Sequence, residues 1–472
     1  MLEGEEESVV EVPAPPPRRD WVSTMRSMKL ALVLPGVLAG LTNTDVAAVV
    51  TFTQSGSTFA LASLKFQLLC IPVMFTFQEF GARLGTKGRG LLVMTRDELG
   101  PTTTNFVFSI LLVLCAATLF CEAAGVAAIA ELWQAPKAFA VFVYSVVLLY
   151  TLTFRSTVAE YLCLGLAALL TFFVVLAGMA ARERSPGWNL SSLNLANSEY
   201  DVLVVSATIG SALTPFLLFY QCAAAVDGRV SKRDLGPLRI NIMIGILLSV
   251  ACSVGITLSA AFEFWNVDDA PSIRTIQDCG DAFSRALGAS GTIIFSLGLV
   301  GAAMTSSFTT LSTIKLAWAE VCGPPQKAEK QQQQQPALLA QTPEEENPLL
   351  RTEPVAAAKA TALPSTTTMT KRFFPRVDPA MRLCVAALAV CDLTVLATTK
   401  NQQIKLEVQA QNLDCVLIPP ALYLAIKIAR RTLDKDEYPE SERRAHVIGS
   451  ILLSICALLP LLLAILIKVG VA

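Results

Sequence analysis

Residues 40–51 read GLTNTDVAAVVT, and they place one carboxylate, Asp45, inside an apolar run that extends from Leu30 to Phe52. A charged side chain at the centre of a bilayer costs roughly 3 kcal/mol or more, so such residues are rare and face protein or water. The same run contains Pro35 and a polar cluster directly before the aspartate, and these features weaken a helix there. The stretch therefore predicts an interrupted membrane-spanning segment that carries a functional acid.

The composition of the whole chain agrees with a membrane protein of many spans. Of its 472 residues, 53% are hydrophobic and 16% are charged, and the mean hydropathy is +0.54. Soluble domains contain about 25% charged residues, and about 20 apolar residues cross the hydrocarbon core as a helix. The net charge of −1 says nothing about a nucleic-acid partner, but the lack of a basic face with interleaved aromatic residues argues against one. We predict eleven spans, at residues 30–53, 60–81, 105–133, 138–154, 158–181, 203–226, 238–264, 291–320, 379–397, 406–428 and 446–468.

Segments outside these spans are predicted to be cytosolic and disordered. The N-terminal segment is acidic and rich in proline, and the longest loop contains a run of glutamines. Lys and Arg gather at alternate span ends, which predicts a cytosolic N-terminus. The predicted organisation is a disordered cytosolic tail at 1–28, transmembrane helices 1–8 at 29–322, a disordered low-complexity cytosolic loop at 323–378, and transmembrane helices 9–11 at 379–472.

Two short motifs bear on location. Asn189 begins an N-glycosylation sequon in a predicted outer loop, which predicts a glycoprotein. Glu345, Leu349 and Leu350 form an acidic dileucine pattern in the cytosolic loop, although a pattern this short also arises by chance. It resembles the sorting signal that clathrin-adaptor proteins read. We therefore expect a protein of the plasma membrane or of an endosomal or vacuolar membrane in a eukaryote.

Residue types that carry catalysis are scarce. The chain has twelve cysteines and one histidine, His446. Most cysteines lie in apolar spans and none forms a Cys-x-x-Cys pair, so we interpret them as small packing residues. No nucleophile–base set can be assembled, and the sequence predicts neither an enzyme nor a bound cofactor.

A second span is interrupted like the first. Residues 204–221 read VVSATIGSALTPFLLFYQ, with Gly210 and Pro215 near the centre and polar residues around them. Backbone groups freed by such breaks must meet protein or line a wet cavity. The two interrupted spans lie five apart, which suits two inverted five-helix repeats with broken first helices around a central substrate site. The alternative is a pair of proline-kinked helices in a generic bundle.

Several stretches resemble the Nramp family of divalent-metal transporters. They are LPGVLAGLTNTDVAAVVTFTQSGS at 34–57, QEFGARLGTKGRGL at 78–91, IGSALTPFLLFYQCAAAVDG at 209–228 and AQNLDCVLIPPAL at 410–422. The resemblance covers roughly residues 30–320 and 379–430. It implies an all-α polytopic membrane protein with two inverted five-helix repeats, helices 1 and 6 broken, and an eleventh helix. This is the fold of the amino acid–polyamine–organocation superfamily.

The resemblance also implies a metal site. The family's Asp-Pro-Gly-Asn motif falls on residues 45–48, its Met-Pro-His-Asn motif falls on 214–217, and its helix-ten glutamine falls on Gln411. Asp45 and the glutamine are kept, whereas Ala48 replaces an asparagine and Thr214 replaces the methionine. Thioethers favour soft transition metals, and carboxylate, hydroxyl and water suit hard ions. We predict that Asp45, Thr42, Thr214 and Gln411 bind a partly hydrated Mg²⁺ or Mn²⁺ as transported substrate, as in the Nramp-related magnesium transporters.

Further residues are candidates for the permeation pathway. Glu122 matches the family's helix-three glutamate, but Leu119 and Phe216 stand where the family has an aspartate and a histidine that carry protons. This loss predicts uncoupled or weakly proton-coupled transport. Asp414, three residues after Gln411, adds a carboxylate to the pathway or serves helix packing. The remaining pathway candidates are Ala48, Pro215 and Glu79, of which Glu79 equally suits a structural pair with Arg83.

Two other functions fit the same fold. An amino-acid or other organic-solute transporter needs a tight glycine-rich break in helix one, and Gly36 and Gly40 are far apart for that role. Asp45 would also repel a substrate carboxylate. A signalling protein on an Nramp-like membrane domain is expected to carry a long cytosolic domain after the last span, whereas this sequence ends at Ala472.

Overall fold

The computed structural model describes residues 30–153, 165–183, 202–265, 273, 275–323, 378–435, 437–444, 446–451 and 454. Several predictions fall outside these residues: the tail at 1–28, nearly all of the loop at 323–378 with its dileucine motif, the sequon at Asn189, and most of the eleventh span.

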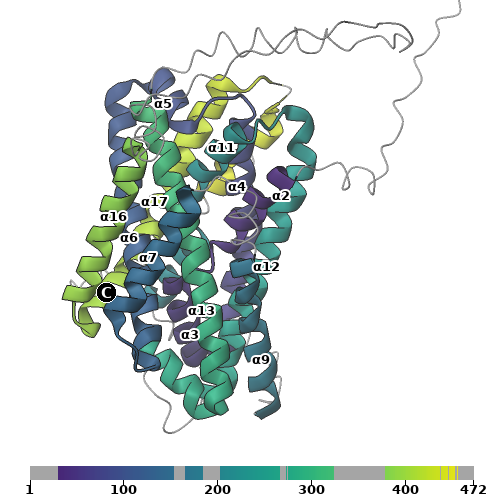
Figure 1. The fold of residues 1–472 in the computed structure, drawn as a ribbon. Coiled ribbons are helices and arrows are strands. Elements are labelled where there is room, and N and C mark those ends of the chain that lie inside the picture. Colours follow the sequence, from purple (N-terminus) through teal and green to yellow (C-terminus); the bar gives the residue numbers. More distant parts are fainter. Residues whose placement is uncertain are drawn as a thin grey trace, which may run out of the picture.

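The described residues form helices and no strand (Figure 1). The helices of the first half are α2 (Leu30–Leu41), α3 (Val46–Phe59), η1 (Ala60–Ser63), α4 (Leu64–Gly85), α5 (Leu91–Leu99), α6 (Pro101–Leu132), α7 (Lys137–Thr153), η2 (Leu169–Thr171) and α9 (Phe172–Glu183). Those of the second half are α10 (Val202–Ala212), α11 (Phe216–Asp227), η4 (Lys232–Asp234), α12 (Leu235–Phe264), α13 (Ile276–Cys322), α16 (Pro379–Ala397) and α17 (Lys400–Thr432).

Eight helical stretches of the described chain are long and apolar enough to cross a membrane, and α7 is a shorter apolar helix. They coincide with predicted spans two to ten, and the first of them, Val46–Gly85, also includes the second half of span one. Helix α13 is longer than the predicted span at 291–320. At Gly288 the chain takes φ 66° and ψ −158°, so a preceding helix joins the span through a kink that glycine permits.

Both predicted breaks are present, but the first lies later in the chain than its glycines suggest. Helix α2 ends at Leu41 and α3 begins at Val46, so Pro35 and Gly40 lie inside α2. Gly40 serves helix contact instead: a Cβ there would lie 2.3 Å from the backbone of Gly245 on α12. The second break separates α10 from α11 at residues 213–215.

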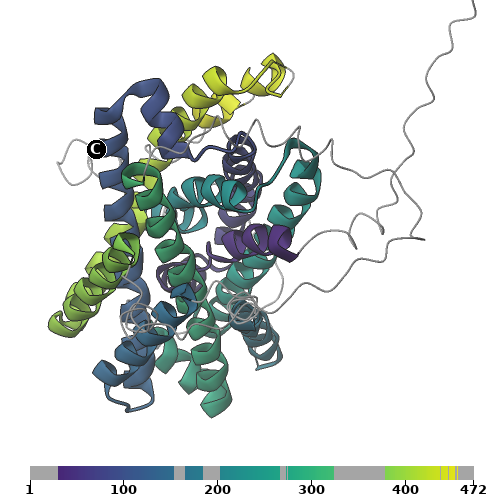
Figure 2. The ribbon, with the colours of Figure 1, turned by 45° about the horizontal axis from the view of Figure 1, so that its top comes forward.

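The broken helices occupy the interior of the bundle. Helix α3 contacts α6, α10, α12, α13 and α17, and residues 46–53 are all buried. Figure 2 shows the purple N-terminal helices among teal and green helices from the second half. Large apolar side chains are exposed on the outer helices, such as Phe139 on α7 and Leu393 on α16, each 67% exposed. An apolar outer surface around a polar central break is the arrangement expected in lipid.

A charge cluster joins one end of α4 to α12 and to the segment after α17. Glu79 Oε1 accepts hydrogen bonds from Arg83 at 2.8 Å and from Arg239 at 2.7 Å. Arg83 also donates to Glu442 at 2.6 Å. The structure thus pairs the buried carboxylate of Glu79, a predicted pathway candidate, with two arginines.

Glu437 lies next to this charge cluster, because Arg83 also donates to its backbone oxygen, and it is expected to make a pH-dependent contribution to stability. Burial acts to raise the pKa of Glu437, but hydrogen bonds from Lys87 and Lys232 outweigh it and lower the pKa from 4.5 to about 2. Because the folded pKa is depressed, the contribution is complete above pH 4.5 and is lost as pH falls towards 2. We expect Glu437→Gln to lower the Tm in detergent at pH 7, with a smaller difference at pH 3.5.

Glu440→Gln is the matched control, because Glu440 and its partner Arg444 are each 75% exposed and exposed pairs contribute little. A Tm difference for Glu437→Gln that stays constant between pH 7 and pH 3.5 would contradict this account.

Candidate metal-binding site

Asp45 is the first residue of the site, and it also explains why α3 begins where it does. Its backbone is extended, with φ −83° and ψ 176°, and its Oδ1 accepts a hydrogen bond of 2.6 Å from the Ala48 N–H. A carboxylate in this N-cap position satisfies a backbone donor that the helix itself leaves free. Ala48 therefore contributes its backbone to the site, and its methyl side chain is buried.

Gln411 of α17 lies directly against this carboxylate. Its Nε2 is 3.4 Å from both Oδ1 and Oδ2 of Asp45. The two side chains are 3% and 4% exposed. Gln411 Oε1 is buried and has no hydrogen-bond partner among the described residues. The structure thus brings together the two residues that the family motif assigns to metal binding.

Gly210 allows the second break to lie close to Gln411. A Cβ on Gly210 would lie 2.1 Å from the backbone oxygen of Gln411, so α10 and α17 are in direct backbone contact. The break follows at once, with Thr214 buried and Pro215 immediately before the first turn of α11. Within the described part of the chain, the Thr214 side chain forms no hydrogen bond.

Thr42 is engaged elsewhere. Its Oγ1 donates to the Leu38 carbonyl at 2.8 Å and lies 2.8 Å from Thr309 Oγ1 on α13. Its neighbour Thr44 contacts Ser249 on α12, with 2.8 Å between the hydroxyl oxygens. These hydroxyls fasten the first break to the surrounding helices.

Glu122 of α6 lies at the N-terminus of α3. Its Oε2 accepts from the Val46 N–H at 3.4 Å. Gly125, one turn later on α6, permits the approach, since a Cβ there would lie 2.6 Å from the Val46 side chain. The partial positive charge of a helix N-terminus favours nearby carboxylates. Leu119 and Phe216 are fully buried apolar residues in the positions that carry protons in the resembling family.

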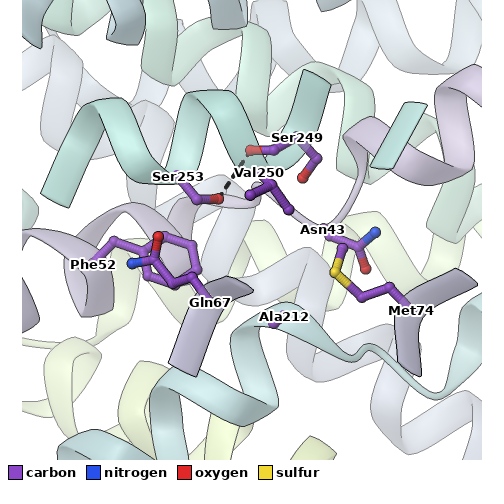
Figure 3. Close-up of a pocket in the computed structure, with 8 residues that line it drawn as sticks. All are labelled: Asn43, Phe52, Gln67, Met74, Ala212, Ser249, Val250 and Ser253. Atoms are coloured by element: carbon purple, nitrogen blue, oxygen red, sulfur yellow. Dashed lines mark hydrogen bonds between the residues drawn. The ribbon is translucent and has the colours of Figure 1, made fainter. Parts of the chain in front are cut away.

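A narrow cavity borders both breaks, with Asn43 at the first break and Ala212 at the end of α10 (Figure 3). Sequence reasoning did not predict its lining from α4 and α12. Gln67 is one of its polar lining residues: its Nε2 donates to Thr257 at 2.6 Å, while its buried Oε1 has no partner among the described residues. The sequence feature that could have indicated this lining is a glutamine, Gln67, within an apolar span. The lining residues are Asn43, Phe52, Gln67, Met74, Ala212, Ser249, Val250 and Ser253.

The chemistry of the site is that of few charges and several neutral oxygens. In the described ranges, no group of three or more His, Cys, Asp or Glu side chains could hold a metal ion. Asp45 supplies carboxylate oxygens and Gln411 an amide oxygen. The two breaks end helices α2 and α10, and the last carbonyls of a helix lack regular helix partners. Such a donor set suits a hard cation that keeps part of its water shell.

Comparison with known proteins agrees with the fold. Residues 36–334 match the family model described as natural resistance-associated macrophage protein-like, Nramp. A manganese transporter from Eremococcus coleocola, crystallised with an aromatic bis-isothiourea compound, is similar at a TM-score of 0.63 with 16% identity over 96% of this chain and 89% of that one. No curated protein sequence matches.

Two more distant structures share the architecture. MHP1, a nucleobase-cation-symport-1 family transporter, matches at a TM-score of 0.57 with 11% identity, covering 92% of this chain and 90% of that one. MhsT, in complex with L-phenylalanine, matches at 0.51 with 14% identity, covering 91% and 99%. The proteins with this fold differ in what they bind or carry, so the fold alone does not assign a substrate.

The predicted fold class is therefore confirmed: an all-helical membrane protein with the inverted-repeat architecture of these transporters. The family model covers more than half of the chain, including both breaks, Asp45 and the α10–α11 motif. The chain belongs to the Nramp family, a family of membrane transport proteins rather than enzymes.

Proposed function

We propose that this protein is a divalent metal cation transporter that moves Mg²⁺ or Mn²⁺ by alternating access, with Asp45 as its charged ligand. One observation carries the proposal. Asp45 is 4% exposed and forms no ion pair with any Lys or Arg of the described chain. A buried carboxylate without a cation is strongly unfavourable. A transported cation would supply the missing charge.

The ligand set favours a hard ion. Asp45 would bind directly, Thr214 would offer a hydroxyl, and the Gln411 amide would rotate so that its orphaned Oε1 faces the ion. Thr42 would join only if its hydroxyl turned away from Leu38 or Thr309. Mg²⁺ gives up its water reluctantly and binds through one or two carboxylates, and Mn²⁺ prefers similar oxygen donors.

The breaks support alternating access, because each divides a helix into two segments that can move separately about a central site. Uncoupled or weakly coupled transport is supported by Leu119 and Phe216, which cannot carry protons. Glu122 remains as an acid near the site, but its Oε2 already accepts from Val46.

The placement in the cell is part of the proposal. The chain is an integral multi-pass membrane protein. The Lys and Arg pattern supports a cytosolic N-terminus. The motif at Glu345, Leu349 and Leu350 supports adaptor-directed sorting to an endosomal or vacuolar membrane, with the plasma membrane as the alternative.

Ion preference can be tested by restoring a thioether. We expect Thr214→Met to raise Cd²⁺ uptake relative to Mg²⁺ uptake in proteoliposomes by about tenfold, the effect of one ligand worth about 1.4 kcal/mol. The reason is that a thioether favours soft ions, whereas a hydroxyl does not.

Leu218→Met is the matched control, because Leu218 is buried on α11 beyond the break. An unchanged Cd²⁺ to Mg²⁺ ratio in Thr214→Met, or an equal rise in Leu218→Met, would remove Thr214 from the ligand set.

A further inference from the structure

Asp414 on α17 is a buried acid, as is Asp45 at the first break. It is 4% exposed, and its Oδ1 is buried without a hydrogen bond. Among the residues that the structure describes, it forms neither a hydrogen bond nor an ion pair. A carboxylate left in this state is costly, so its presence requires an explanation.

Its position relates it to Asp45. Asp414 follows Gln411 by three residues, so both side chains project from the same side of α17. Gln411 in turn contacts both carboxylate oxygens of Asp45 at 3.4 Å. The Asp414 and Asp45 carboxylates are close enough to interact electrostatically. The buried thiol of Cys115 on α6 is a further titratable group that interacts electrostatically with Asp414.

Two other acids in the membrane-spanning helices are held by polar partners. Glu79 is paired with Arg83 and Arg239. Asp392 on α16 accepts a 2.6 Å hydrogen bond from Ser145 on α7. A residue retained for helix packing is expected to have such a partner. Asp414 instead interacts electrostatically with a second carboxylate, that of Asp45, and this interaction is repulsive when both are charged and no cation lies between them.

We propose that Asp414 and Asp45 form a two-carboxylate binding site for a divalent cation, with the Gln411 amide between them. This inference rests on the proposed function and deepens it, since two negative charges match the charge of the ion. Ligand charge count sets affinity in oxygen-donor sites. A site of this charge also favours divalent over monovalent cations, because only a divalent ion neutralises it.

The test is Mn²⁺ binding to the full-length protein in detergent, read as the Mn²⁺-dependent rise in Tm. We expect Asp414→Asn to weaken apparent Mn²⁺ affinity by roughly tenfold or more. We also expect it to raise the Tm without divalent ions, because it removes the repulsion. Asp392→Asn is the matched control and is expected to keep wild-type affinity.

Asp414→Ser serves as a second variant if the asparagine variant does not fold, and the same loss of affinity is expected. Mn²⁺ affinity in the folded Asp414 variant equal to that of Asp392→Asn would overturn the inference.

Flux measured on the same proteins separates this inference from the proposed function. If wild type binds Mn²⁺ in an Asp414-dependent manner and carries none across liposome membranes, the proposed function fails and the two-carboxylate site stands. If wild type transports Mn²⁺ and the Asp414 variants have the same Mn²⁺ affinity and KM as wild type, the two-carboxylate site is wrong and the proposed function stands.

Discussion

Asp45→Asn is expected to weaken Mn²⁺ binding by about 100-fold or more while leaving the protein folded. Removal of a supporting residue already costs about 10–100-fold in metal sites, and Asp45 would be a direct ligand. Asparagine keeps an oxygen that accepts from the Ala48 N–H, and it is as good an N-cap as aspartate. The variant therefore removes the charge without removing the helix cap. Isothermal titration of Mn²⁺ into the purified protein measures the loss.

Asp45→Ala provides the contrasting variant. It removes both the charge and the cap, so its Tm is expected to fall, by a free energy of about 1 kcal/mol for the cap. The two variants are expected to share the binding defect and to differ in stability. Mn²⁺ affinity in Asp45→Asn within about twofold of wild type would exclude Asp45 as a ligand, since such a difference is under 1 kcal/mol.

Gly210→Ala carries the second large effect. The new Cβ would lie 2.1 Å from the Gln411 backbone oxygen, a distance that forces α10 and α17 apart. Overpacking of this kind costs about 1–3 kcal/mol, and here it also moves Gln411 away from Asp45. We expect a lower Tm and a loss of uptake of about tenfold or more, because misplacement by about 1 Å is expensive at a functional site.

Gly178→Ala is the matched control, since a Cβ on this α9 residue would meet nothing within 4 Å. Uptake and Tm measured on both variants test whether the close contact at Gly210 positions Gln411. Equal behaviour of the two variants would show that the contact between α10 and α17 does not position the site.

Local sequence features predicted the elements that depend on local physics. Membrane-length apolar runs predicted the helices, and the two polar interruptions predicted breaks five spans apart. The pairing of Asp45 with Gln411 came from the family motif, and the structure places the two side chains in contact. No pattern within either segment alone could have indicated that contact.

Features that depend on distant partners could not be predicted. Gly40 looks like a helix breaker until Gly245, far along the chain, is found against it. Glu79 and Arg83 look like an isolated surface pair, whereas both are buried and pair further with Arg239 on α12 and with Glu442. Thr42 resembles a ligand in the sequence, whereas Thr309 on α13 holds its hydroxyl.

If Asp45 binds the transported ion, transport requires its negative charge. The most direct measurement is uptake of Mg²⁺ and Mn²⁺ into proteoliposomes that contain ion-sensitive dyes and a pH probe, with wild type compared with Asp45→Asn. We predict that wild-type vesicles fill with at least one of these ions with little or no internal acidification, and that Asp45→Asn vesicles stay at the protein-free background. Filling of Asp45→Asn vesicles at the wild-type rate, or no filling by wild type, would contradict the account.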